Sequence, residues 1–202
     1  EPAASFVWPV NPSKDPLCAL SLAAEPKQPV RIIALDLSAA FDRLQHWAVL
    51  EELERRQVPA GLRHLVHSFL TERSLRVYLG DAVSAAYKPE RGVPQGASLS
   101  PLFFSLVMSG AHRLPRPPGT SLISYADDFV LVSRAEPTAA AAAQVYLDNL
   151  LLWLSKRGLS ANASKSGYMD LRLGRPTSTT SAPPPSIPGD PVPPKLCLRL
   201  LG

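Results

Sequence analysis

Residues 121–133, SLISYADDFVLVS, place two adjacent aspartates between two apolar runs. The runs on either side are rich in Ile, Leu and Val, and they predict two short buried strands joined in a hairpin. A two-residue hairpin turn normally contains Gly or Asn, and this stretch contains neither. Two carboxylates so close disfavour each other's ionisation unless a cation compensates, and Mg²⁺ prefers carboxylate oxygens. Asp127 and Asp128 are therefore candidate metal ligands.

The rest of the chain predicts an α+β fold, because helical and strand patterns alternate along it. Helices interleaved with antiparallel strands favour a sheet with helices packed on one face. The predicted strands lie at 30–38, 121–125, 129–133 and 165–173, with a further hairpin at 74–88 around Gly80-Asp81. The predicted helices lie at 38–58, 59–73, 101–114 and 137–157.

Composition and hydrophobic periodicity divide the 202-residue chain into four regions. Residues 1–30 have no sustained period and predict a poorly ordered lead-in, and residues 31–173 carry the folded pattern. Residues 174–194 are dominated by Pro, Ser and Thr, a composition typical of an extended linker or insertion. Residues 195–202 predict a terminal strand.

Charge and cysteine content exclude several classes of protein. A net charge of +4 is compatible with a polyanionic partner, as it is for many ordinary proteins. Two cysteines are too few for a disulfide framework or a Cys-based zinc site. No apolar run approaches the roughly 20 residues that cross a bilayer, and no targeting signal is visible. We expect an intracellular protein with no membrane contact.

Asp36 ends the apolar run at residues 30–36, VRIIALD. An Asp at a strand end is, taken alone, most often a turn former or a helix cap. If this strand lies beside the 121–133 hairpin, Asp36 joins Asp127 and Asp128. Such carboxylates could share two metal ions about 3.5–4 Å apart, the arrangement used in phosphoryl and nucleotidyl transfer.

The loop RGVPQGASLSP, residues 91–101, leads into the third predicted helix. Gly92 and Gly96 allow close backbone approach or positive φ, and Pro94 makes the loop rigid. The free N–H groups at the helix start favour anions, and Gln95 can hydrogen-bond a base, sugar or phosphate. Seen alone, such a loop is as often an ordinary connection between elements.

Together these stretches resemble, in order, the motifs of reverse transcriptases from non-LTR (LINE-type) retrotransposons. Residues 34–59 look like motif A and its helix, RGVPQGASLSPLFFSLVMS like motif B, and ISYADDFVLVS like motif C. WLSKRGLSANASKSGYM looks like motif D, and LCLRLLG like motif E. The resemblance covers residues 31–202 apart from the Pro-rich linker. It implies a polymerase palm-like antiparallel sheet with partial fingers and no thumb.

The resemblance also implies roles for individual residues. Asp36, Asp127 and Asp128 would be the catalytic, metal-binding carboxylates, and Lys165 would lie near the pyrophosphate as a proton donor. The implied nucleotide-binding positions are Leu37 and Ala40 through backbone N–H groups, Phe41 as steric gate under the sugar, and Gln95 with Gly96. Taken alone, Phe41 is more often a core residue and Lys165 a solvated charge.

The implied reaction is RNA-directed DNA synthesis, in which a primer 3′-hydroxyl attacks the α-phosphate of a dNTP. Its implied cofactors are two Mg²⁺ ions, with Mn²⁺ as a substitute, and its partners are an RNA template, a DNA primer and dNTPs. Nuclear action is expected of the family.

Three alternatives stay open. The first is a catalytically inactive retroelement remnant that at most binds nucleic acid. The second is another palm-fold nucleotidyltransferase such as a nucleotide cyclase, against which GVPQG and Phe41 argue. The third is an ordinary α+β domain in which Asp36 lies far from Asp127.

Overall fold

A computed structural model describes residues 29–172, 175–176 and 182–195. The chain divides into two units. Unit 1 consists of residues 1–36, 116–147 and 163–202, and unit 2 of residues 37–115 and 148–162. The predicted lead-in and the predicted terminal strand lie almost wholly outside the described residues.

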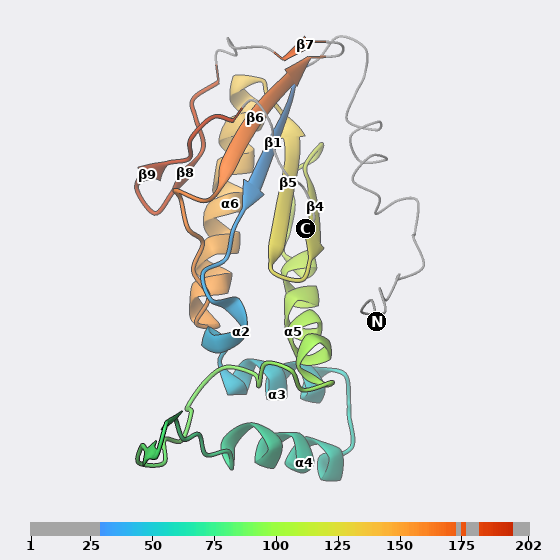
Figure 1. Ribbon diagram of the computed structural model, residues 1–202. Coiled ribbons are helices and arrows are strands. Elements are labelled where there is room, and N and C mark those ends of the chain that lie inside the picture. Colours follow the sequence, from blue (N-terminus) through green and yellow to red (C-terminus); the bar gives the residue numbers. More distant parts are fainter. Residues whose placement is uncertain (1–28, 173–174, 177–181, 196–202) are drawn as a thin grey trace, which may run out of the picture. The chain divides into compact units, whose positions relative to one another are not determined.

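Unit 1 is built on a five-stranded sheet in the order β4-β5-β1-β6-β7 (Figure 1), and every neighbouring pair is antiparallel. The sheet therefore has the antiparallel pairing predicted from the sequence. Its strands are β1 Val30–Leu35, β4 Ser121–Tyr125, β5 Asp128–Arg134, β6 Gly167–Arg172 and β7 Arg175–Pro176.

The central strands bury side chains on both faces of the sheet. On one face Ile32 lies across from Val132 in a buried cluster, and on the other Ile33 lies across from Leu131. Each such side chain contributes about 1.5–3 kcal/mol on burial. Burial on both faces explains why these runs are continuously apolar, and it gives the hairpin between β4 and β5 a rigid base.

The helix α6, Pro137–Lys156, agrees with the predicted helix and begins at Pro137, whose fixed φ suits a first helical position. Its first part belongs to unit 1 and its last part to unit 2. In unit 1 it buries Ala140, Ala143, Tyr146 and Leu147. Among the described helices, none combines the length and the apolar character needed to span a membrane.

The segment 182–195, of which residues 182–194 were predicted as part of a linker, forms a short hairpin of β8 Ser186–Ile187 and β9 Asp190–Pro191. The segment belongs to unit 1, and its backbone contacts β1 of the same unit. Arg31 on β1 donates to the Pro183 carbonyl at 2.5 Å and to the Ala182 carbonyl at 3.4 Å. A Pro-rich backbone retains its carbonyl acceptors, so a buried guanidinium can order a segment whose composition alone suggests a linker.

Unit 2 is mainly helical. Its core contains Leu44, Leu53, Phe104 and Leu154, all buried. The predicted hairpin is present, with Gly80 at φ 59° in its turn. The elements are α2 Ala40–Arg43, α3 His46–Arg55, α4 Ala60–Thr71, β2 Tyr78–Leu79, β3 Ala82–Val83, α5 Ser100–Met108 and the 3₁₀ helix η2 Ser109–Arg113.

The helix predicted over residues 38–58 is broken at Leu44, which has ψ 125°. The break has a tertiary cause. The Leu44 carbonyl accepts from the Gly92 N–H at 2.7 Å, and the Gln45 N–H donates to the Arg157 carbonyl at 3.0 Å. These two contacts replace hydrogen bonds of a continuous helix, and local sequence carries no sign of either partner.

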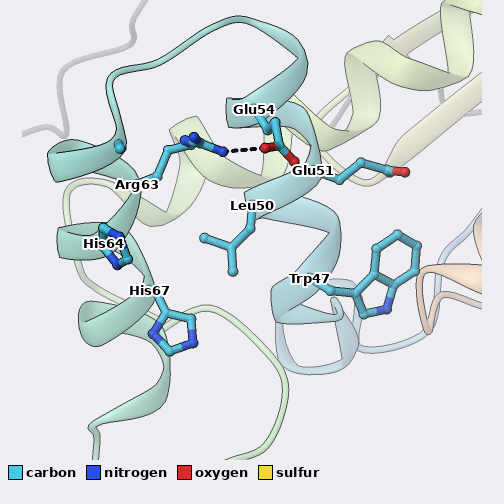
Figure 2. A pocket seen from close by; sticks show the side chains of 8 residues that line it. Trp47, Leu50, Glu51, Glu54, Arg63, His64 and His67 are labelled. Atoms are coloured by element: carbon cyan, nitrogen blue, oxygen red, sulfur yellow. Dashed lines mark hydrogen bonds and ion pairs between the residues drawn. The ribbon is translucent and has the colours of Figure 1, made fainter.

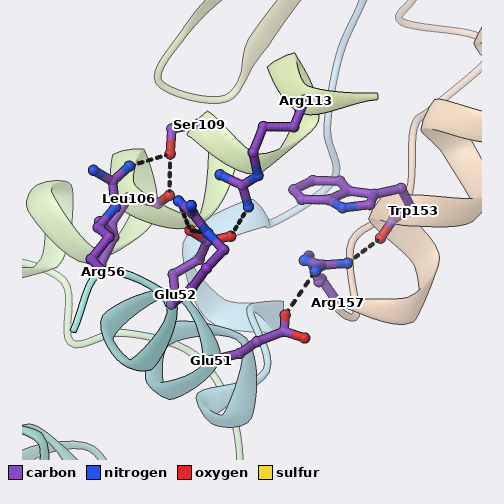
Figure 3. Close-up of polar contacts among 9 residues, drawn as sticks. Glu51, Glu52, Arg56, Leu106, Ser109, Arg113, Trp153 and Arg157 are labelled. Atoms are coloured by element: carbon purple, nitrogen blue, oxygen red, sulfur yellow. Dashed lines mark hydrogen bonds and ion pairs between the residues drawn. The ribbon is translucent and has the colours of Figure 1, made fainter. Parts of the chain in front are cut away.

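A buried glutamate ties α3 to η2 in unit 2 (Figure 3). Glu52 accepts from Arg55 at 2.9 and 3.0 Å and from Arg113. Burial raises the pKa of Glu52, but the hydrogen bonds and positive charges of Arg113 and Arg55 outweigh it, and the net shift is downward. Nearby, Arg157 lies 4.0 Å from the Trp153 ring and donates to Glu51 at 2.8 Å.

Candidate active site

The strand register of unit 1 brings the candidate carboxylates to the same end of the sheet. Leu35, the last residue of β1, pairs with Phe129, so Asp36 and Asp128 each adjoin that pair directly. Asp128 in turn pairs with Tyr125, which leaves Ala126 and Asp127 as the hairpin turn. Opposed residues of antiparallel strands have Cα atoms about 4.5–5.5 Å apart. The register therefore argues against an ordinary domain with Asp36 far from the hairpin.

The oxygens of this end of the sheet fit a hard cation. The Oδ2 atom of Asp36 is buried and has no hydrogen-bond partner among the described residues, while Asp127 and Asp128 are partly buried. A buried carboxylate oxygen without a partner is costly, and a divalent ion would satisfy it. In the described residues, however, no three His, Cys, Asp or Glu side chains converge closely enough to hold an ion. The case for a cation at this place therefore rests on the chemistry of the carboxylate oxygens and on the strand register that brings them together.

Lys165 lies in the same unit, just before β6. Its side chain is exposed, and its backbone carbonyl accepts from the Lys195 ammonium at 2.8 Å. The next residue, Ser166, is buried, and its hydroxyl oxygen accepts from the Asp36 N–H at 3.2 Å. The structure thus links the Lys165 segment to the backbone of Asp36.

The predicted nucleotide-binding residues lie in unit 2. Leu37 is buried and forms an isolated bridge with Ala161. Ala40, also buried, begins α2. Phe41 is half-buried and stacks on Phe104, with ring centroids 4.5 Å apart and planes 18° from parallel. Phe41 is therefore a partly packed aromatic ring with one portion accessible, which suits both a core role and a steric gate.

The 91–99 loop is fixed to α2 by backbone and side-chain contacts. Val93 donates to the Phe41 carbonyl at 2.8 Å, and the Gln95 amide donates to Asp42 Oδ1 at 2.8 Å. Gly92 has φ 83°, and a Cβ atom there would lie 2.6 Å from the Asp42 carbonyl oxygen, so only glycine fits. Gly96 has φ 85°, and a Cβ atom added there would meet nothing within 4 Å, which leaves its backbone open to close approach.

Two basic side chains hold the start of this loop. His46 is buried and its Nε2 lies 2.9 Å from the Gly92 carbonyl, which also accepts from Arg73 at 2.8 Å. Burial lowers the pKa of His46, the hydrogen bond to Gly92 opposes that effect, and the charge of Arg73 adds to the lowering. A neutral His46 that donates from Nε2 satisfies this geometry.

Sequence reasoning missed the residues that support the predicted ones. Asp42 stands inside the motif A-like stretch, but its partner Gln95 is 53 residues away. Ser166 and Lys195 likewise act on residues distant in sequence, and no local pattern marks them. Only the adjacency of Ser166 to Lys165 could have drawn attention to it.

A separate cavity of about 440 Å³ lies between α3 and α4 of unit 2 (Figure 2). It contains none of the predicted site residues. Its charges are largely paired, since Glu54 accepts from Arg63 at 2.6 Å and Glu51 from Arg157. Its lining residues are Trp47, Leu50, Glu51, Glu54, Ala60, Arg63, His64 and His67.

Comparison with known sequences finds one protein family along most of the chain. The family described as "Reverse transcriptase (RNA-dependent DNA polymerase)" matches residues 3–186. The chain is 30% identical over 187 residues to the probable RNA-directed DNA polymerase from transposon X-element of Drosophila melanogaster, covering 89% of this chain and 20% of that protein. It is 33% identical over 141 residues to the RNA-directed DNA polymerase from mobile element jockey of the same species, covering 65% and 15%.

A third relative is the Pol polyprotein from type-2 retrotransposable element R2DM of Drosophila melanogaster, 34% identical over 142 residues, with 66% of this chain and 13% of that protein covered. The chain spans about a fifth or less of the length of these curated relatives.

Solved structures share the fold at low identity. Apo telomerase from Candida tropicalis, truncated from its C-terminal domain, superposes with a TM-score of 0.61 at 16% identity, covering 85% of this chain and 35% of that one. Telomerase from Candida albicans, in complex with a fragment of telomeric RNA, gives 0.57 at 20% identity, with 81% and 29% covered. The described α+β arrangement is therefore a fold already seen in these two telomerase structures.

Proposed function

This chain belongs to the reverse transcriptase (RNA-dependent DNA polymerase) family, and from that premise we propose that it is the palm region of an RNA-directed DNA polymerase of a non-LTR retrotransposon. The proposed reaction adds dNTPs to the 3′-hydroxyl of a DNA primer along an RNA template. The observation that carries the proposal is the register of β1 and β5, which sets Asp36 beside the hairpin of Asp127 and Asp128.

We assign metal binding to these three carboxylates. Asp36 supports the assignment with a buried oxygen that has no hydrogen-bond partner in the part of the chain that the structure describes, and Asp127 and Asp128 add two more carboxylates at the same sheet end. When bound, two Mg²⁺ or Mn²⁺ ions would activate the attacking oxygen and stabilise charge on the leaving one. The sheet supplies rigidity, because both faces of β1 and β5 are buried and the carboxylates cannot easily separate.

The remaining predicted residues would bind the nucleotide. Phe41, held by Phe104, would lie under the sugar and exclude a 2′-hydroxyl. Gln95 donates one N–H to Asp42, which leaves its carbonyl oxygen and second N–H for a nucleotide. Gly96 would allow close backbone approach. Lys165, exposed beside Asp36's hydrogen-bond partner, would protonate the leaving pyrophosphate.

A primer-extension assay tests the proposal on a poly-rA template with an oligo-dT primer, dTTP and Mg²⁺ or Mn²⁺. The unsubstituted chain should incorporate dTTP, and Asp127→Ala and Asp128→Ala should abolish incorporation. Asp81→Ala, in an exposed turn of unit 2, is the matched control and should retain activity. Incorporation that survives both substitutions would refute the assigned roles.

The second candidate function is a catalytically inactive remnant that binds nucleic acid. The specific observation in its favour is that no three potential ligands converge to hold an ion in the described residues. No incorporation at any protein concentration, together with retention of the template–primer in a gel-shift assay, would support it. Primer-independent cyclisation of GTP or ATP would instead support a nucleotide cyclase.

A further inference from the structure

We propose that Ser166 and Lys195 are positioning residues for the Asp36 carboxylate, and that residues 182–195 form a strap that brings Lys195 to its place. The inference rests on the proposed function, because it assumes that Asp36 binds a metal ion. It assigns a role to a Pro-rich segment that carries no residue of the proposed catalytic set.

Ser166 holds the backbone at the point where β1 ends. The last register pair between β1 and β6 is Ala34 with Gly167, so Asp36 lies beyond that ladder. The Ser166 hydroxyl accepts from the Asp36 N–H at 3.2 Å and is buried, with the residue only 1% exposed. A hydrogen bond to the backbone of Asp36 restricts its φ and ψ, and therefore the direction in which its side chain leaves the sheet.

Lys195 in turn holds the segment that contains Ser166. Its ammonium donates to the Lys165 carbonyl at 2.8 Å, and its N–H donates to the Tyr168 carbonyl at 2.9 Å. Its aliphatic stem covers Gly167, where a Cβ atom would lie 2.5 Å from the Lys195 Cδ. These three contacts fix residues 165–168 around Ser166.

Two further sets of contacts anchor the strap. Gln144 on α6 donates to the Ser186 carbonyl and accepts from the Ser186 N–H, both at 3.0 Å. Arg31 donates to the carbonyls of Ala182 and Pro183, while two of its nitrogens bind Asp170 at 2.8 Å. The strap is therefore held at its start and middle, and Lys195 acts from its far end.

The deciding experiment measures amide hydrogen exchange, Mn²⁺ binding and primer extension on the full chain. Ser166→Ala should speed exchange of the Asp36 amide about three- to tenfold, the effect of losing one hydrogen bond. It should weaken Mn²⁺ affinity, measured from the free-ion electron paramagnetic resonance signal, by a similar factor. In primer extension kcat should fall with little change in KM for dTTP, because nucleotide contacts lie on other residues.

Matched variants separate positioning from general destabilisation. Ser133→Ala removes a hydroxyl that is equally buried but has no hydrogen-bond partner within the described ranges, and all three readouts should be unchanged. Ser166→Thr retains the acceptor oxygen and should restore them. Lys195→Met keeps the stem over Gly167 and removes the ammonium, so it should reproduce a smaller form of the Ser166→Ala effect, whereas Lys156→Met on the exposed end of α6 should have none.

The outcomes separate the positioning role of Ser166 from the proposed polymerase activity. Unchanged Asp36 exchange in Ser166→Ala, or equal effects of Ser133→Ala, would overturn the positioning role. Faster exchange with unchanged Mn²⁺ affinity would overturn it too, as would a chain that binds no Mn²⁺. If the unsubstituted chain extends no primer but the exchange and Mn²⁺ results hold, the proposed polymerase activity fails and the positioning of Asp36 stands.

Discussion

Replacing Asp170 by alanine should destabilise unit 1 far more than an ordinary surface substitution. Asp170 and Arg31 face each other across β6 and β1 with side chains 6% and 3% exposed, and two guanidinium nitrogens reach the carboxylate at 2.8 Å. Removing one partner of a buried ion pair costs about 3–5 kcal/mol. Since Arg31 would retain its hydrogen bonds to the carbonyls of Ala182 and Pro183, we expect a loss in the free energy of unfolding at the lower end of this range, about 3 kcal/mol.

Thermal unfolding followed by circular dichroism measures the effect. For a chain of this length, about 3 kcal/mol corresponds to a fall in Tm of roughly 6–12 °C. Arg31→Met/Asp170→Leu should cost less than Asp170→Ala, because an apolar pair leaves no buried charge. Asp190→Ala, an exposed aspartate of the same unit, is the control and should change Tm little. A loss under about 1 kcal/mol for Asp170→Ala, or a double variant as costly as the summed single variants, would refute the reasoning.

Three further outcomes are expected. Burial depresses the pKa of His46 in the folded state, so around and below about pH 6.5 the unfolded chain binds more protons than the folded chain. The free energy of unfolding should therefore fall as the pH drops through about 6.5. In urea unfolding at about pH 5.5 and 7.5, His46→Gln should reduce the difference between the two values. Gly92→Ala should destabilise unit 2 by about 1–3 kcal/mol in the same assay, because its φ is 83° and the added Cβ would meet the Asp42 carbonyl; an unchanged unfolding midpoint would show that the loop is not so confined. Phe41→Val should raise incorporation of UTP relative to dTTP in primer extension, and an unchanged ratio would remove Phe41 from the steric-gate role.

The sheet was predictable because each of its central strands is a short run of apolar, largely β-branched residues. The β-branched run that forms β1 and the apolar runs of β4 and β5 are stable mainly as buried strands of a sheet. The same apolar pattern placed Asp36 at the end of its apolar run and Asp127 in the hairpin, although β1 ends at Leu35 and not at residue 38 as predicted. Asp36 and Asp127 lie at one end of the sheet because of the strand register. The local residue pattern does not predict that register; only the order of the family-like motifs suggested it.

The contacts that fix the candidate site were not predictable, because they join residues distant in the chain. The break at Leu44 depends on Gly92 and Arg157, and a continuous helix was the better expectation from local spacing. The Pro-rich composition of 182–194 likewise indicated a linker, since nothing in the neighbouring sequence shows that Arg31 and Gln144 hydrogen-bond to this segment. Tertiary hydrogen bonds of this kind override local preference.

The positive φ of Ala126 has a consequence for engineering this chain. Ala126 adopts φ 50° in the turn immediately before Asp127. A left-handed alanine costs about 1–2 kcal/mol, whereas glycine at that place would relieve the strain and lose about 0.4–1 kcal/mol to chain entropy. Ala126→Gly is thus a route to a more heat-resistant protein, and it would loosen the hairpin tip that holds the acidic pair. The methyl group of Ala126 would therefore lower thermal stability while keeping the turn before the proposed metal-binding carboxylates in place.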